Sequence, residues 1–114
     1  MKKLRHIGNC AVDSGQLLII DPCYLRDWVD GESEGDNHYA ITCRTTMSKD
    51  QAGEILVAGV GGIGVAASSG LGDGNYPVYA EYVNIGTKSK PDIRISKLTI
   101  DFELERMTEV YDKL

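Results

Sequence analysis

The sequence lacks a long hydrophobic run and an excess of basic charge. No uninterrupted apolar stretch is longer than Leu17–Ile20, whereas a membrane-spanning helix needs about 20 residues. The 17 acidic residues outnumber the 12 basic ones and give a net charge of −5, which argues against binding along a nucleic-acid duplex. No apolar signal segment follows the basic start at Lys2 and Lys3. We therefore expect a cytoplasmic protein that binds neither membranes nor duplex nucleic acid.

Paired cysteines and histidines are also scarce. The three cysteines, Cys10, Cys23 and Cys43, form no CxxC pair, and only two histidines are present. Neither a disulfide framework nor a zinc site is therefore predicted, and we expect no metal and no cofactor. The 114 residues are enough for a single domain, spanning residues 1–114, because a second one would be too short to bury its own core.

What the chain does have is glycine and short β-branched runs. It contains 13 glycines, and runs of Val, Ile, Thr and Tyr between turn residues are typical of many short strands. The fold class predicted is mainly β, a small antiparallel sandwich or partly open barrel, with a C-terminal helix over residues 103–114 as a possible addition. A bulge near Ser96 and Lys97 would turn the apolar residues on both sides of it toward the core. The predicted strands are 6–12, 16–21, 38–45, 55–60, 63–68, 76–84 and 92–102.

Two segments resemble known ligand loops without satisfying them. Residues 59–64 match GxGxxG, but Gly70 leaves no room for the helix that a dinucleotide site needs. A hairpin joined at Gly61 and Gly62 is the better interpretation. Residues 25–37 form an acidic segment that begins like a calcium loop at Asp30, but Ile41 stands where the bidentate glutamate belongs. A solvated acidic loop is therefore predicted there.

The six tyrosines contrast with a single Phe and a single Trp. A tyrosine ring offers a flat surface and one hydroxyl, which suit the stacking of a base or a protein interface. A nucleobase between tyrosines, with its phosphate near Arg44 or Arg94, is one hypothesis; a sheet face covered by tyrosines is the simpler alternative. The candidate ligand-binding residues are Tyr24, Arg44, Asp73, Tyr76 and Tyr79.

A catalytic alternative uses acidic residues and a thiol. Asp21 and Asp73 could form a carboxylate pair for hydrolysis, and Cys23 with His38 could act as nucleophile and base. Both aspartates also stand where turns favour Asp, before Pro22 and Gly74. No catalytic residue is assigned, and a non-enzymatic protein is favoured over a hydrolase, which stays an open alternative.

Three motifs together resemble a known family. They are the DSG at residues 13–15 leading to DPCY at 21–24, the GDGNYPVY at 72–79, and Ile100-Asp101-Phe102. The set is similar to a family of small uncharacterised phage and bacterial proteins, a domain of unknown function. The resemblance implies a compact β-rich fold and a phage or bacterial source, and it carries over no catalytic residue.

Three functions follow as hypotheses. The first is a non-enzymatic binding protein, for example a phage counter-defence protein that sequesters a nucleotide-type small molecule or blocks a host protein. The second is a small hydrolase that uses Asp21, Asp73 and Cys23. The third is a structural interaction protein with no ligand. Because a small β domain with exposed tyrosines gains from burying them against a partner, a homo-oligomer is also expected.

Overall fold

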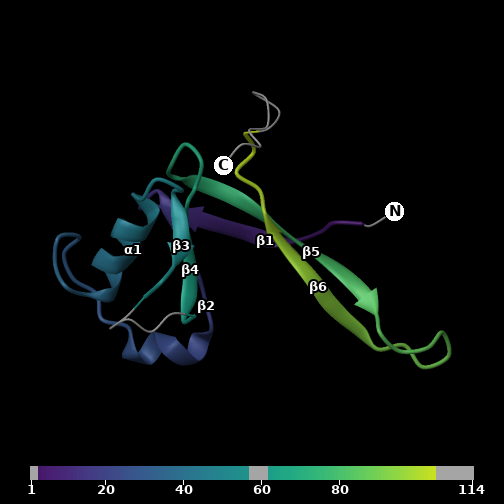
Figure 1. Cartoon of the computed structure of the whole chain (residues 1–114). Helices are drawn as coiled ribbons and strands as arrows, with labels where there is room; N and C mark the ends of the chain where they lie inside the picture. Colours follow the sequence, from purple (N-terminus) through teal and green to yellow (C-terminus); the bar gives the residue numbers. More distant parts are fainter. Residues whose placement is uncertain (1–2, 57–61, 105–114) are drawn as a thin grey trace. The chain divides into compact units, whose positions relative to one another are not determined.

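The computed structural model describes residues 3–56 and 62–104. Its elements in chain order are β1 (Arg5–Val12), β2 (Gln16–Ile20), the 3-10 helix η1 (Pro22–Asp27), α1 (His38–Thr46), β3 (Ala52–Glu54), β4 (Gly64–Ser68), β5 (Gly74–Asn84) and β6 (Ile93–Ile100). The described chain is mainly β, with two antiparallel three-stranded sheets ordered β1-β5-β6 and β2-β4-β3 (Figure 1). The predicted fold class is confirmed at this level.

The chain divides into two compact units. The hairpin unit comprises residues 1–11 and 74–109 and holds the β1-β5-β6 sheet, whereas the helix unit comprises residues 12–73 and 110–114 and holds α1 with the β2-β4-β3 sheet. No helix in the described ranges is long and apolar enough to cross a membrane.

In the helix unit, α1 lies on one face of the β2-β4-β3 sheet. Gln16 donates through Nε2 to the Cys43 sulfur over 3.4 Å, and the Thr46 hydroxyl donates to Gln16 Oε1 over 2.6 Å. The Ser68 hydroxyl, opposite Gln16 in the register, donates to the Thr46 carbonyl over 3.0 Å. These bonds satisfy polar groups under the helix, where an unpaired group would be costly. Because side chains alternate along a strand, the odd-numbered residues of β2 and β4 lie on the opposite, helix-free face.

The interpretation of residues 38–45 as a strand is wrong, because they form α1. Asn37 begins the helix: its Oδ1 accepts a hydrogen bond from the Ala40 N–H over 2.8 Å, as a good N-cap does. The hydroxyls of Thr42 and Thr45 donate to carbonyls four residues earlier, so threonine is accommodated inside the helix. The alternation of apolar and polar residues at 39–44 is short, and the N-cap at Asn37 favours a helix more strongly than this alternation favours a strand.

The other predicted elements have mixed outcomes. Five strands stand close to the predicted ranges, as β1, β2, β4, β5 and β6. The strand expected at 55–60 is replaced by the earlier β3, whose ladder continues through the Ile55 N–H to the Gly64 carbonyl, 2.8 Å away. Residues 57–61, with part of the predicted glycine hairpin, lie outside the described residues. So does 105–114, most of the predicted C-terminal helix, while Glu103 has a positive φ of 61° and is not helical.

The predicted bulge in β6 is confirmed. Glu81 pairs with Lys97 and Tyr82 pairs with Ile95, so Ser96 is the extra residue. The bulge keeps Ile93, Ile95 and Leu98 on one face, as expected from their sequence. These three side chains are exposed, however, and not part of a core.

Candidate functional site

The five candidate ligand residues fall into two groups. Tyr24 in η1, Arg44 in α1 and Asp73 before β5 belong to the helix unit, whereas Tyr76 and Tyr79 in β5 belong to the hairpin unit. The residues of the first group lie in η1, in α1 and in the turn before β5. The two tyrosines of the second group contact different neighbours.

Tyr76 and Tyr79 lie on opposite faces of β5, because their positions differ by an odd number. Tyr76 meets Phe102 edge-on at a centroid distance of 5.1 Å. Tyr79 meets the His6 ring of β1 at 5.6 Å. One base therefore cannot stack between these two tyrosines.

The contacts of Tyr76 bring two of the sequence motifs together. A Cβ added to Gly74 would stand 2.9 Å from the Tyr76 ring, so the glycine leaves space for this side chain. Next to it, the Asp101 N–H donates to the Pro77 carbonyl over 3.1 Å. The GDGNYPVY and Ile-Asp-Phe segments thus hold one another in place, which gives these motif residues a structural role.

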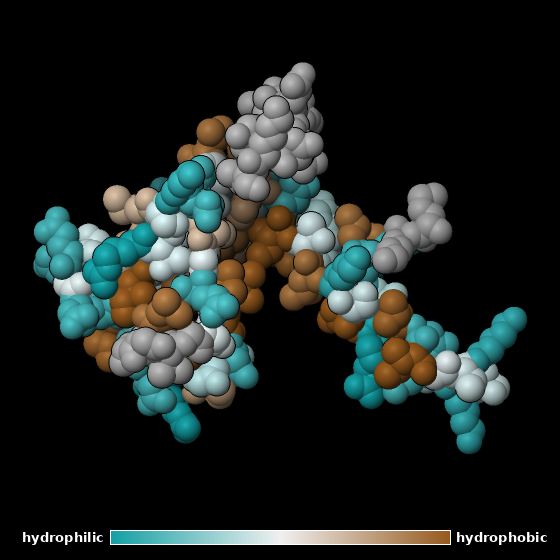
Figure 2. Space-filling view, in the orientation of Figure 1, coloured by the Kyte–Doolittle hydropathy of each residue, from teal (hydrophilic) through white to brown (hydrophobic). Residues whose placement is uncertain are grey.

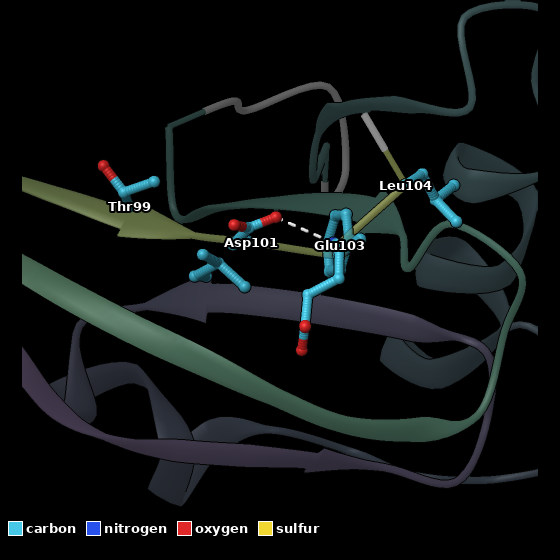
Figure 3. A pocket seen from close by; sticks show the side chains of 6 residues that line it. Thr99, Asp101, Glu103 and Leu104 are labelled. Atoms are coloured by element: carbon cyan, nitrogen blue, oxygen red, sulfur yellow. Dashed lines mark hydrogen bonds between the residues drawn. The ribbon is translucent and has the colours of Figure 1, made fainter. Parts of the chain in front are cut away.

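A cavity of about 360 Å³ lies beside this contact, lined by residues 99–104. Figure 3 shows the Asp101 carboxylate accepting a hydrogen bond from the Glu103 backbone N–H, at 2.7 Å. Both Asp101 and Glu103 line the cavity and place acidic groups around it. Like charges repel at short range, so this cavity disfavours the phosphate of a nucleotide.

The two arginines considered for phosphate binding have partners within the chain. Arg44 donates through Nη1 to the Gly35 carbonyl over 3.2 Å and so ties the acidic loop to α1. Arg94 forms a two-pronged ion pair with Asp92, at 2.7 and 3.2 Å. Both side chains are exposed, and each helps to hold a loop or a turn.

The residues of the hydrolase hypothesis are also engaged locally. Asp21 caps η1 by accepting from the Cys23 N–H over 3.0 Å. Desolvation by neighbouring atoms, a hydrogen bond with Asp21 and the negative charges of Asp21 and Asp27 raise the pKa of the Cys23 thiol. A raised pKa lowers the thiolate fraction and works against nucleophilic catalysis.

His38, the first residue of α1, contacts the acidic loop and forms no catalytic pair with Cys23 among the interactions described. Its Nδ1 accepts from the Val29 N–H over 2.8 Å, and its ring stacks on Trp28 at 4.9 Å. The Trp28 indole in turn donates to Asp30 over 2.7 Å. Among the residues that the structure describes, no group of three or more His, Cys, Asp and Glu is placed to hold a metal ion.

The feature that sequence reasoning missed is an exposed apolar face on the β1-β5-β6 sheet, here called the hairpin face. Ile95 pairs with Tyr82 and Leu98 with Ala80, so these side chains share one side. Arg5 lies over the Tyr82 ring at 5.8 Å, which puts the alternating residue Ile7 on that side too. The hairpin face consists of Ile7 (49% exposed), Tyr82 (42%), Ile93 (56%), Ile95 (53%) and Leu98 (60%).

The expectation that Ile93, Ile95 and Leu98 face the core is therefore wrong: they share a face, but each is more than half exposed. Ala80, on the same face, is fully buried, and Ile100 is half-buried. Figure 2 shows apolar residues gathered along the β5–β6 hairpin. The signal was present in the sequence as the alternation of Ile93 and Ile95. An alternating pattern does not say whether an apolar face is covered.

A comparison of the chain with protein-family models, with curated proteins and with solved structures finds no match in any of the three.

Proposed function

We propose that this chain is a non-enzymatic binding protein of the cytoplasm that engages another protein through its hairpin face. The observation that carries the proposal is the set of five large apolar or aromatic side chains, each between 42% and 60% exposed, on one side of one sheet. Contiguous apolar patches of several hundred Å² on a soluble protein typically mark interaction sites. Protein interfaces also have an apolar centre with aromatic residues.

Binding to protein has more support than the two alternatives. For a nucleotide ligand, the candidate tyrosines take opposite faces of β5 and the neighbouring cavity is acidic. For hydrolysis, Asp21 is committed to a helix cap and Cys23 has a raised pKa. The hairpin face, by contrast, offers side chains that gain free energy when they are covered.

The proposal is tested by photocrosslinking in cells. A benzoylphenylalanine placed at Leu98 on the hairpin face is compared with one at Val83, which pairs with Arg94 on the opposite face and is 41% exposed. We expect a discrete protein adduct from position 98 and much less from position 83. Equal labelling from both positions, or no adduct from position 98, would contradict the proposal.

A further inference from the structure

The exposed side chains of the hairpin face would gain free energy if another protein surface covered them. The opposite charges of the two units indicate which surface that is. In the described residues of the hairpin unit, six basic side chains outnumber four acidic ones. In those of the helix unit, ten acidic side chains outnumber three basic ones. One chain thus carries both members of a complementary pair, and complementary charges favour and steer association.

The basic charge is held at a structured tip of the hairpin. Between β5 and β6, Asn84 Oδ1 accepts hydrogen bonds from the backbone N–H groups of Gly86 and Asp92, each at 2.9 Å. The Thr87 hydroxyl accepts from the Lys90 N–H over 3.0 Å. Lys88 and Lys90 therefore project from an organised turn, next to the apolar residues of the hairpin face.

The helix unit offers a second uncovered apolar surface. Ile19 and Val65 are direct partners in the β2–β4 register, and they lie on the helix-free face because Gln16 and Ser68 point to α1. Ile19 is 59% exposed and Val65 is 46% exposed. This helix-free face belongs to the unit that carries the acidic excess.

The size of the hairpin face matches an interface. If a fully exposed Ile or Leu offers about 190 Å² and a Tyr about 230 Å², the exposed fractions leave roughly 500 Å² of surface on the five residues. A standard interface buries about 800 Å² per partner, of which roughly 60% is apolar.

Pairing through the edge of β6 is a poorer alternative. Ser96 is bulged and Lys97 stands beside it on this edge strand, and bulges and lysines are features that block edge-to-edge pairing. The face, rather than the edge, is therefore the surface available for association.

We infer that the hairpin face of one copy binds the helix-free face of a second copy, with the basic hairpin tip against the acidic helix unit. Two such contacts, exchanged reciprocally, close a symmetric dimer. The inference rests on the proposed function and names its partner. It places Leu98 of one copy near the Ile19–Val65 pair of the other.

The test is subunit complementation measured by sedimentation velocity. Wild type is expected to sediment as a dimer, and Leu98→Asp and Ile19→Asp are each expected to weaken dimerisation roughly tenfold or more. Mixing the two variants should restore a heterodimer, because the mixture still contains one intact hairpin face and one intact helix-free face. Val83→Asp, on the opposite side of the hairpin, is the matched control and should remain dimeric. Ile95→Lys and Val65→Asp repeat the test should either first variant fail to fold by circular dichroism.

Four other results would contradict all or part of the inferred dimer. A wild type that stays monomeric up to about 200 μM overturns the inference. Dimerisation of Ile19→Asp with wild-type affinity also overturns it, because the hairpin faces would then bind each other. Raising NaCl from about 0.05 to about 0.5 M should weaken the dimer, and an unchanged affinity contradicts the charge argument. A monomer in solution that still crosslinks through position 98 to another protein refutes this inference and leaves the proposed function standing.

Discussion

The most informative single residue for the stability of the helix unit is Asn37, because its side chain joins α1 to the acidic loop. Its Oδ1 accepts from the Ala40 N–H over 2.8 Å, and its Nδ2 donates to the Glu32 carbonyl over 3.0 Å. Removing an Asn cap costs about 1 kcal/mol, and losing a second hydrogen bond costs about 1 kcal/mol more. We therefore expect Asn37→Ala to lower the free energy of unfolding by about 2 kcal/mol.

A conservative variant distinguishes the contributions of the two Asn37 hydrogen bonds to stability. Asn37→Asp keeps the oxygen that caps α1 and loses the donor to Glu32, so it should cost about half as much as Asn37→Ala. The assay is urea unfolding followed by the fluorescence of Trp28, the single tryptophan of the chain. It is run at one fixed protein concentration, because association would add to the apparent stability.

Two neighbouring glycines provide a further check on this geometry. A Cβ added to Gly31 would stand 2.5 Å from Asn37 Nδ2, and one added to Gly35 would stand 2.7 Å away. Gly31→Ala should therefore destabilise the wild type by about 1 kcal/mol and cost much less in the Asn37→Ala background. Equal stabilities for the Ala and Asp variants at position 37, or fully additive losses with Gly31→Ala, would refute the reasoning.

Three other predictions concern separate parts of the chain. Because the pKa of Cys23 is raised, iodoacetamide at pH 8 should modify it more slowly than an unstructured peptide thiol, and Asp21→Asn should speed the reaction; an unchanged rate contradicts the assigned cause. Gly74→Ala should push the Tyr76 ring aside, since the added Cβ would stand 2.9 Å from it, and should reduce the near-ultraviolet circular dichroism of tyrosine. Gln51 has a φ of 62°, a backbone conformation that glycine adopts more easily. Gln51→Gly should therefore raise the free energy of unfolding by about 0.5 kcal/mol, because the relief of backbone strain exceeds the entropy cost of glycine. A lower melting temperature for this variant would show that the strain is absent.

The features that the sequence predicted correctly arise from interactions between residues close together in the chain. The strands at Gly74–Asn84 and Ile93–Ile100, and the bulge between Ile95 and Lys97, follow from local alternation and turn residues. The helix at His38–Thr46 was missed because a side-chain cap at Asn37 and packing on a sheet outweigh a short alternating pattern.

The candidate site was harder to predict for a physical reason. Residue type identified Tyr76 and Tyr79 as stacking surfaces, but only strand geometry shows that they take opposite faces of β5. Likewise, Ile93 and Leu98 look like core residues in the sequence, and their exposure depends on what the rest of the chain covers. Composition cannot supply that information.

The order of the two units along the chain has a consequence for biosynthesis. The sheet and helix of the helix unit use only residues from Gln16 to Ser68, whereas β1 has to wait for β5 at Gly74–Asn84. As the ribosome extends the chain, the acidic unit can therefore fold first, while the first strand stays unpaired. The β1-β5-β6 sheet is completed last, once β6 at Ile93–Ile100 has been made, so the apolar residues of the hairpin face come together only near the end of synthesis.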